Sequence, residues 1–109
     1  MREYILCAAN HYDDGQEHIH APKNIDSGYV TCGRRHHNCI RTFSQIVGFP
    51  YSVRAQEIHN TETQGFLTNT NRFVNRKEAY TIAFNANQIK GPNKGERENN
   101  IGLTSEDLY

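Results

Sequence analysis

The sequence predicts an α+β protein in which a small antiparallel sheet packs with two main helices. The first third of the chain alternates short apolar runs with turn residues, as strands joined by hairpins do. Two later segments repeat apolar residues with the period of an amphipathic helix. The chain has 109 residues, of which 36% are hydrophobic. This composition fits a single domain, residues 1–109, with a thin core.

The first strand is predicted over residues 4–12, which begin with an apolar run of strand length. Residues 13–15, Asp-Asp-Gly, are a hairpin turn signal. Residues 17–20 then alternate polar and apolar side chains, so we expect them to return as a half-exposed second strand. These segments together predict an N-terminal hairpin.

Two further strands are predicted after a loop at residues 22–28. Residues 29–32 are rich in strand-forming residues and are followed by a glycine, a strand breaker. Residues 65–67 are expected to add a short fourth strand. Residues 51–64 are weakly patterned, and residues 52–59 fit either a surface helix or an excursion between two structural halves.

The first main helix is predicted over residues 36–47, because apolar residues recur there on one helical face. Gly48 and Pro50 end it, since neither residue continues a helix readily. The apolar face comprises Cys39, Ile40, Phe43, Ile46 and Val47.

The second main helix is predicted to start after Asn75, a preferred N-cap residue. Glu78, three positions later, completes the pattern of a capping box. The apolar stripe of this helix consists of Ala79, Ile82, Ala83 and Ala86.

The end of the chain is predicted to be a linker followed by a docking tail. Residues 90–100 are rich in glycine, asparagine and charged residues, which favours a flexible linker. In the tail, Leu103, Leu108 and Tyr109 are expected to dock on the body of the protein or on a neighbouring subunit.

Composition argues against several protein classes. The mean hydropathy is −0.81, and no run approaches the roughly 20 apolar residues of a membrane span. The N-terminus does not read as a signal peptide. Three cysteines are too few for a disulfide scaffold and favour reduced thiols. We therefore expect a cytoplasmic protein without a membrane partner.

The charge is zero overall but is unevenly distributed. Residues 34–77 contain seven basic and two acidic residues, a net charge of +5, and six of the seven are arginine. Residues 1–33 and 78–109 carry net charges of −3 and −2. Arginine forks suit phosphate groups, whereas proteins that coat nucleic acid are usually basic overall. A small anionic ligand is therefore favoured over a DNA or RNA duplex.

One candidate anion-binding segment joins a predicted strand to the first helix. A glycine turn, two guanidinium groups, two imidazoles and an amide meet there at a helix N-terminus, which favours anions. The alternative is a polar connection whose arginines are solvated. The candidate ligand-binding residues are Arg34, Arg35, His36, His37 and Asn38.

A second candidate segment surrounds the start of the second helix. Thr68 and Asn71 belong to a polar loop, and Arg72 and Arg76 flank the helix N-terminus, where an anion is favoured. Phe73 would stack on a base if Val74 supplies the apolar contact that fixes the helix start. The alternative is that Phe73 belongs to the core.

Metal and catalytic motifs are weak in this sequence. Cys32, His36, His37 and Cys39 are all metal-ligand types, but their spacing does not match the usual zinc pairs. No hydrolase elbow, Walker loop or deaminase signature is present. We therefore predict no metal, no cofactor and no enzymatic activity. The alternatives are a small metal- or cysteine-dependent hydrolase acting on a nucleotide or phosphate ester, and a protein-interaction module.

Three parts of the chain resemble a known phage family. They are residues 33–39, GRRHHNC; residues 65–68 with 71–79, GFLT and NRFVNRKEA; and residues 105–109, SEDLY. The chain resembles the first anti-Thoeris family, small phage proteins that act as nucleotide sponges for cyclic ADP-ribose signals of bacterial immunity. The similarity covers the first strand to the last residue, apart from residues 51–64 and the linker.

The resemblance implies a sheet with helices and homodimers that assemble further into hexamers, with ligand pockets at subunit interfaces. Some members also resemble sponges for cyclic oligonucleotides, which they hold at a second site. It thus implies a protein of the host cytoplasm that sequesters a cyclic nucleotide without degrading it. The roles of single residues follow from their chemistry and not from the resemblance. Four arginines are expected to hold phosphates, and four other side chains to read polar edges: Arg34, Arg35, Arg72 and Arg76, and His36, His37, Asn38 and Asn71.

Overall fold

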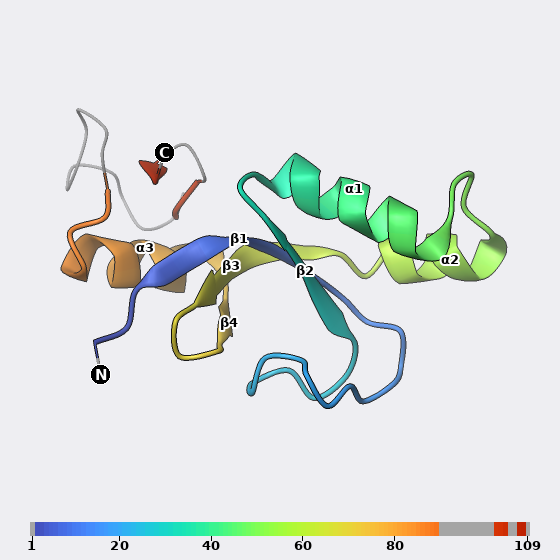
Figure 1. The fold of residues 1–109 in the computed structure, drawn as a ribbon, viewed down its shortest axis with the longest axis horizontal. Helices are drawn as coiled ribbons and strands as arrows, with labels where there is room; N and C mark the ends of the chain where they lie inside the picture. The colour runs from blue at the N-terminus through green and yellow to red at the C-terminus, as the bar shows by residue number, and fades with distance from the viewer. Residues whose placement is uncertain (1, 90–101, 105–106, 109) are drawn as a thin grey trace.

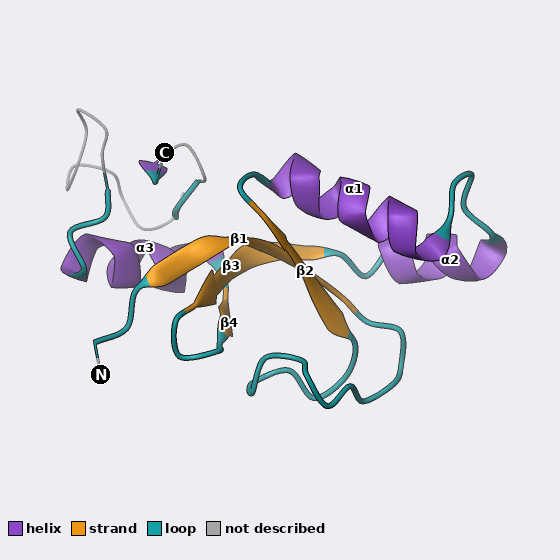
Figure 2. Cartoon of the chain, in the orientation of Figure 1, coloured by secondary structure: helices purple, strands orange, loops and turns teal. Residues whose placement is uncertain are grey.

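A computed structural model describes residues 2–89, 102–104 and 107–108 of this protein. Its centre is one antiparallel sheet with strand order β2-β1-β3-β4, flanked by helices (Figures 1 and 2). The predicted α+β class is confirmed. The predicted linker at residues 90–100 and the tail residue Tyr109 lie outside the described residues.

The long strand β1 (Ile5–Tyr12) lies in the middle of the sheet, between β2 (Tyr29–Gly33) and β3 (Thr63–Thr68). Ala9 faces Cys32 on one side and Gly65 on the other. The short strand β4 (Phe73–Val74) completes the sheet beside β3. The predicted first, third and fourth strands are therefore present.

The predicted strand at residues 17–20 is wrong. These residues belong to the long loop between β1 and β2, and Ile19 is 94% exposed. The loop is closed locally by a 2.8 Å contact between His18 and Asp14, which supplies no partner for β1. The hairpin partner of β1 is β2 instead, because its β-branched and aromatic residues fit a half-buried sheet better than the polar segment does.

Helix α1 (His36–Val47) occupies the predicted range, and α2 (Val53–His59), capped by Ser52, settles the alternatives for residues 52–59 in favour of a helix. Helix α3 (Arg76–Asn85) starts after Asn75, whose side chain accepts a hydrogen bond from the Glu78 amide at 2.8 Å. The predicted N-cap is therefore confirmed. None of the helices in the described part of the chain is long and apolar enough to cross a membrane.

Both main helices pack on one face of the sheet. Ala8 and Phe66 are direct cross-strand partners, so their side chains share a face. This face meets Cys39 of α1 and Ala79 and Ala83 of α3 in the main core. The same core includes the tail residues Leu103, 0% exposed, and Leu108, 8% exposed.

A second, smaller core lies toward α2. Tyr12 stacks on Phe43 of α1 with ring centroids 4.0 Å apart, and Ile58 of α2 completes the cluster. Beyond it the turn from α1 to α2 leaves apolar side chains uncovered. Ile46, Phe49 and Val53 are 60%, 78% and 81% exposed. Ile46 was expected on the apolar face of the helix but is exposed, whereas its neighbour Val47 packs against the smaller core.

The β1–β2 loop, residues 13–28, crosses the width of the sheet to reach β4. The side-chain amide of Asn24 accepts from the Phe73 N–H at 2.8 Å and donates to the Phe73 carbonyl at 2.7 Å. The Lys23 amide donates to the Asn71 carbonyl at 2.9 Å. The loop is therefore attached to the strand farthest from β2.

Candidate functional site

The two segments predicted to bind an anion meet over β3. The Nε2 atom of His36, the first residue of α1, lies 2.8 Å from the carbonyl oxygen of Gly65. Because a carbonyl only accepts, Nε2 carries a proton, and in the neutral ring Nδ1 is then an acceptor. Nδ1 lies 3.5 Å from Nη2 of Arg76, the first residue of α3. One imidazole thus connects the N-termini of two helices that the sequence separates by 40 positions.

Arg76 extends this contact with two further hydrogen bonds. Its Nη2 donates to Gln64 Oε1 at 2.6 Å, and its Nη1 donates to the carbonyl oxygen of Leu103 at 2.9 Å. These three partners are uncharged when His36 is neutral. Within the described contacts, the half-buried Arg76 guanidinium therefore has no carboxylate to offset its charge.

The N-terminus of α1 adds partial positive charge to this place. Its first turn contains no acidic residue, so the helix dipole is not compensated there. Asn38, predicted to read a ligand edge, instead accepts from the Arg35 amide at 3.0 Å and thereby holds the helix start. Arg34 and His37 are exposed, and Arg35 is half-buried. We call His36, Gln64, Arg76 and the first turn of α1 the helix-junction site.

Thr68 and Arg72, from the second predicted segment, belong to a separate cluster. Both contact the carboxylate of Glu3, which lies just before β1. Glu3 Oε2 accepts from the hydroxyls of Thr68 at 2.8 Å and Thr70 at 2.5 Å, and from Nε of Arg72 at 2.9 Å. Glu3 Oε1 accepts from Nη2 of Arg72 at 2.7 Å. We call Thr68, Thr70 and Arg72 the Glu3 cradle.

The electrostatics of the Glu3 cradle follow from these contacts. The hydrogen bond from Arg72, followed by that from Thr70, lowers the pKa of Glu3 from 4.5 to about 2. Arg72 also contacts Glu78 Oε2 at 3.1 Å, so its guanidinium faces two carboxylates. In contrast to Arg76, its charge is neutralised within the chain.

Phe73 and Asn71 lie apart from the helix-junction site. Phe73 is 9% exposed, and its ring centroid lies 5.9 Å from that of His11. Val74 is 1% exposed, so both candidates for the apolar contact are buried. Asn71 is exposed in the left-handed region with φ of 63°, a conformation that asparagine tolerates. The structure buries the Phe73 ring, as the alternative of a core role expects, and presents little of it for stacking on a base.

The comparison with protein families decides the affiliation of the chain. The model of the phage T4 y16D protein family matches residues 4–109. The chain belongs to this family. The family is one of phage proteins, which confirms that part of the resemblance. The search of curated proteins gave no match. The search of solved structures gave none either.

The four side chains weighed as a metal site are not brought together in this y16D-family fold. The Thr31 hydroxyl donates to the Cys39 carbonyl at 2.9 Å, so Thr31 faces α1 and its neighbour Cys32 faces the opposite side of the sheet. Cys39 is fully buried, and burial raises the pKa of its thiol to about 11. Among the described residues, no group of three or more metal-ligating side chains is suitably placed.

Sequence reasoning missed Glu3, Gln64 and Thr70. Glu3 reaches Arg72 across 69 positions, and Gln64 reaches Arg76 across 12, so no local pattern marks either pair. Glu3 lies in the acidic N-terminal third of the chain, so the sequence carries no local signal that pairs it with the basic central segment. The y16D-family chain thus builds both clusters from residues distant in sequence.

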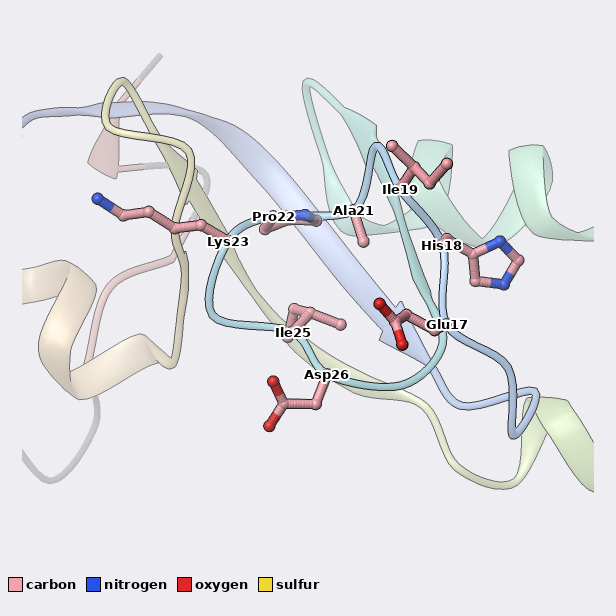
Figure 3. A pocket seen from close by; sticks show the side chains of 8 residues that line it. All are labelled: Glu17, His18, Ile19, Ala21, Pro22, Lys23, Ile25 and Asp26. Carbon is pink, nitrogen blue, oxygen red and sulfur yellow. The ribbon is translucent and has the colours of Figure 1, made fainter.

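One further hollow lies within the β1–β2 loop, away from both clusters. It has a volume of about 460 Å³, and Figure 3 shows the Glu17 and Ile25 side chains on its inner side. Its lining mixes acidic, basic and apolar residues, and these do not make up a set of hydrogen-bond donors suited to a phosphate group. The lining residues are Glu17, His18, Ile19, Ala21, Pro22, Lys23, Ile25 and Asp26.

Proposed function

We propose that this phage-family protein binds a cyclic nucleotide signal at the helix-junction site and sequesters it. The observation that carries the proposal is the 3.5 Å contact between His36 Nδ1 and Arg76 Nη2. It unites two segments that were each predicted to bind an anion. It also leaves a guanidinium with uncharged partners beside a helix N-terminus, the combination that phosphate prefers.

The surrounding residues extend the chemistry toward a nucleotide. Arg34 and Arg35 immediately precede His36, and their guanidinium groups would hold a second phosphate. His37 is exposed and supplies donors for a sugar or base edge. A cyclic ADP-ribose isomer, with its pyrophosphate, fits this donor set, and so does a cyclic oligonucleotide.

Sequestration without chemical conversion is supported by the state of the nearby side chains. Both ring nitrogens of His36 are engaged, by Gly65 and by Arg76, so this imidazole is poorly placed as a general base. The thiol of Cys39, the nearest cysteine in sequence, has a pKa of about 11 and is protonated at neutral pH. The rival hydrolase would need an activated nucleophile here.

We further propose that the protein acts as a homodimer or a hexamer in the host cytoplasm. The side chains of Ile46, Phe49 and Val53, at and beside the α1–α2 turn, are apolar and exposed. Such a surface favours association, and a second copy of the chain is the partner implied by the resemblance. We call these three residues the helical-tip surface.

The proposal is tested with a nucleotide panel followed by heat release. The protein is incubated with cyclic ADP-ribose isomers, cyclic dinucleotides and cyclic trinucleotides, washed, and heated. A sponge returns the bound ligand intact, as mass spectrometry of the supernatant would show. Recovery of a hydrolysed product would favour the hydrolase. Absence of any retained nucleotide would contradict both.

A further inference from the structure

The Glu3 cradle presents more hydrogen-bond donors than a carboxylate usually attracts. One oxygen of Glu3, Oε2, accepts from two hydroxyls and from Nε of Arg72. The other accepts from Nη2 of the same arginine. One oxygen thus receives three donors, and the arginine binds both oxygens in a bidentate manner. Proteins bind phosphoryl oxygens with the same kind of donor set. A phosphoryl group, with three terminal oxygens, would share these donors more evenly.

The carboxylate that occupies the cradle belongs to a segment at the edge of the fold. Residues 2–4 precede β1, and Asn69 holds them through three hydrogen bonds. It accepts from the Tyr4 amide at 2.6 Å and donates to the Arg2 carbonyl at 3.0 Å and the Tyr4 carbonyl at 3.1 Å. Arg2 also donates to the Asn85 carbonyl. The Glu3 and Arg72 side chains are 23% and 30% exposed. Both partners of the pair are therefore accessible to solvent, and Glu3 lies outside both hydrophobic clusters.

We propose that Glu3 is a built-in competitor for a phosphate-binding cradle formed by Thr68, Thr70 and Arg72. A phosphate ester displaces the Glu3 carboxylate, takes its four donors, and frees residues 2–4. The inference rests on the proposed function only in taking the incoming phosphate to be that of a nucleotide. It adds a donor, Thr70, and a regulatory residue, Glu3, to the sequence-predicted set.

The tethered carboxylate of Glu3 lowers the affinity of the cradle for an external anion. A tethered group competes at an effective concentration in the millimolar range, so it weakens the binding of an external anion. The competitor is charged at every pH above about 2, since that is the pKa of Glu3 in the cradle. Removing its charge should therefore raise the affinity of the cradle for phosphate across the physiological range.

The test measures the binding of inorganic pyrophosphate to Glu3→Gln by calorimetry. Glutamine keeps the size of the side chain but replaces one acceptor by donors, so the cradle is left short of negative charge. We expect at least a tenfold gain in affinity over the unmodified chain. Glu78→Gln is the matched control, because it removes the other carboxylate from Arg72 outside the cradle; it should change affinity less than threefold. Thr70→Val in the Glu3→Gln background should remove most of the gain.

A second measurement uses the unmodified protein and does not depend on the variant's stability. Titration with pyrophosphate, followed by amide NMR, should shift Tyr4 and Asn69, whose hydrogen bonds hold the displaced segment. Equal pyrophosphate affinity in folded Glu3→Gln and the parent would overturn the inference, as would saturation that leaves Tyr4 and Asn69 unshifted. Either result would leave nucleotide binding at Arg76 untouched, so the two proposals fail separately.

Discussion

Leu103 is bonded to Arg76 through both of its peptide groups. Its N–H donates to the Arg76 carbonyl at 2.8 Å, and its own carbonyl accepts from Arg76 Nη1 at 2.9 Å. Gly102, the preceding residue, has a φ of 76° and packs against Arg76. A Cβ added to Gly102 would lie 2.6 Å from the Arg76 backbone. The tail is therefore part of the body at this point, and its contact with Arg76 also orients the guanidinium.

Leu103→Ala is expected to destabilise the protein by about 2–5 kcal/mol, because a fully buried leucine leaves a cavity in the main core. Urea unfolding followed by circular dichroism measures this change. Ile19→Ala, at a 94% exposed position, is the control and should stay within about 0.5 kcal/mol of the parent. A loss at Leu103 no larger than the control would show that the tail does not contribute to the core.

Asn75→Ala is expected to lower the free energy of unfolding by about 1 kcal/mol, because the Glu78 amide loses its acceptor. Asn75→Asp keeps an acceptor at the same place and should retain most of the stability. Nucleotide binding should hardly change in either variant. Equal unfolding midpoints for the alanine variant and the parent would contradict the assigned capping role.

Arg76→Ala is expected to weaken nucleotide binding by about 1.5–3 kcal/mol, roughly ten- to over a hundredfold, because a charge-assisted hydrogen bond is lost. It should also lower stability, since three hydrogen bonds of the guanidinium disappear. Arg76→Lys keeps the charge without the fork and should bind with intermediate affinity. Lys77→Ala, at the exposed next position, is the control for calorimetry. Parent-like binding by Arg76→Ala would remove the helix-junction site from consideration.

The pH dependence of stability should report the Glu3 cradle. The pKa of Glu3 is lowered from 4.5 to about 2 on folding, chiefly by Arg72. A lowered pKa in the folded state stabilises the protein above the unfolded value and ceases to do so as the pH falls through the folded one. The melting temperature of the parent should therefore exceed that of Glu3→Gln at pH 7, and the difference should shrink between about pH 4.5 and pH 2. A difference that does not vary with pH would contradict this assignment.

Phe49→Glu is expected to dissociate the proposed oligomer, because it places a charge on the helical-tip surface. Light scattering coupled to size-exclusion chromatography should give a dimer or hexamer for the parent and a smaller species for the variant. The far-UV circular dichroism spectrum should be unchanged, since Phe49 is 78% exposed in the isolated chain and the fold of one subunit does not depend on it. A monomeric parent at micromolar concentration would contradict the proposal.

Local signals in the sequence predicted the elements well where they agreed with tertiary packing. Asn75 predicted the start of α3 correctly, because an N-cap acts within one turn of the helix. The helical spacing of apolar residues predicted α1. The segment at residues 17–20 misled because four alternating residues resemble a strand whether or not a partner is available. Its place in the hairpin was taken by β2, which the sequence showed only as a third strand.

The candidate site was predictable in its parts and not in its arrangement. His36 and Arg76 were both identified, but nothing local shows that their helices start beside the same strand. Arg72 and Arg76 read alike in the sequence, four residues apart. The fold separates their roles, because a carboxylate 69 positions away neutralises Arg72 whereas Arg76 meets uncharged partners. Contacts between residues so far apart in the chain leave no periodic pattern in the sequence.

The contact between Asn24 and β4 has a consequence for how the sheet ends. The Arg72 carbonyl is bonded inward to the Thr68 amide at 2.9 Å, so the N–H and carbonyl of Phe73 point outward from the sheet. An outward-facing peptide group at a sheet edge is a template for strands of other chains. The Asn24 side-chain amide bonds to both groups at once, in the way that the backbone of a neighbouring strand would. At this position the edge of β4 therefore has no free peptide group to which a strand of another chain could pair.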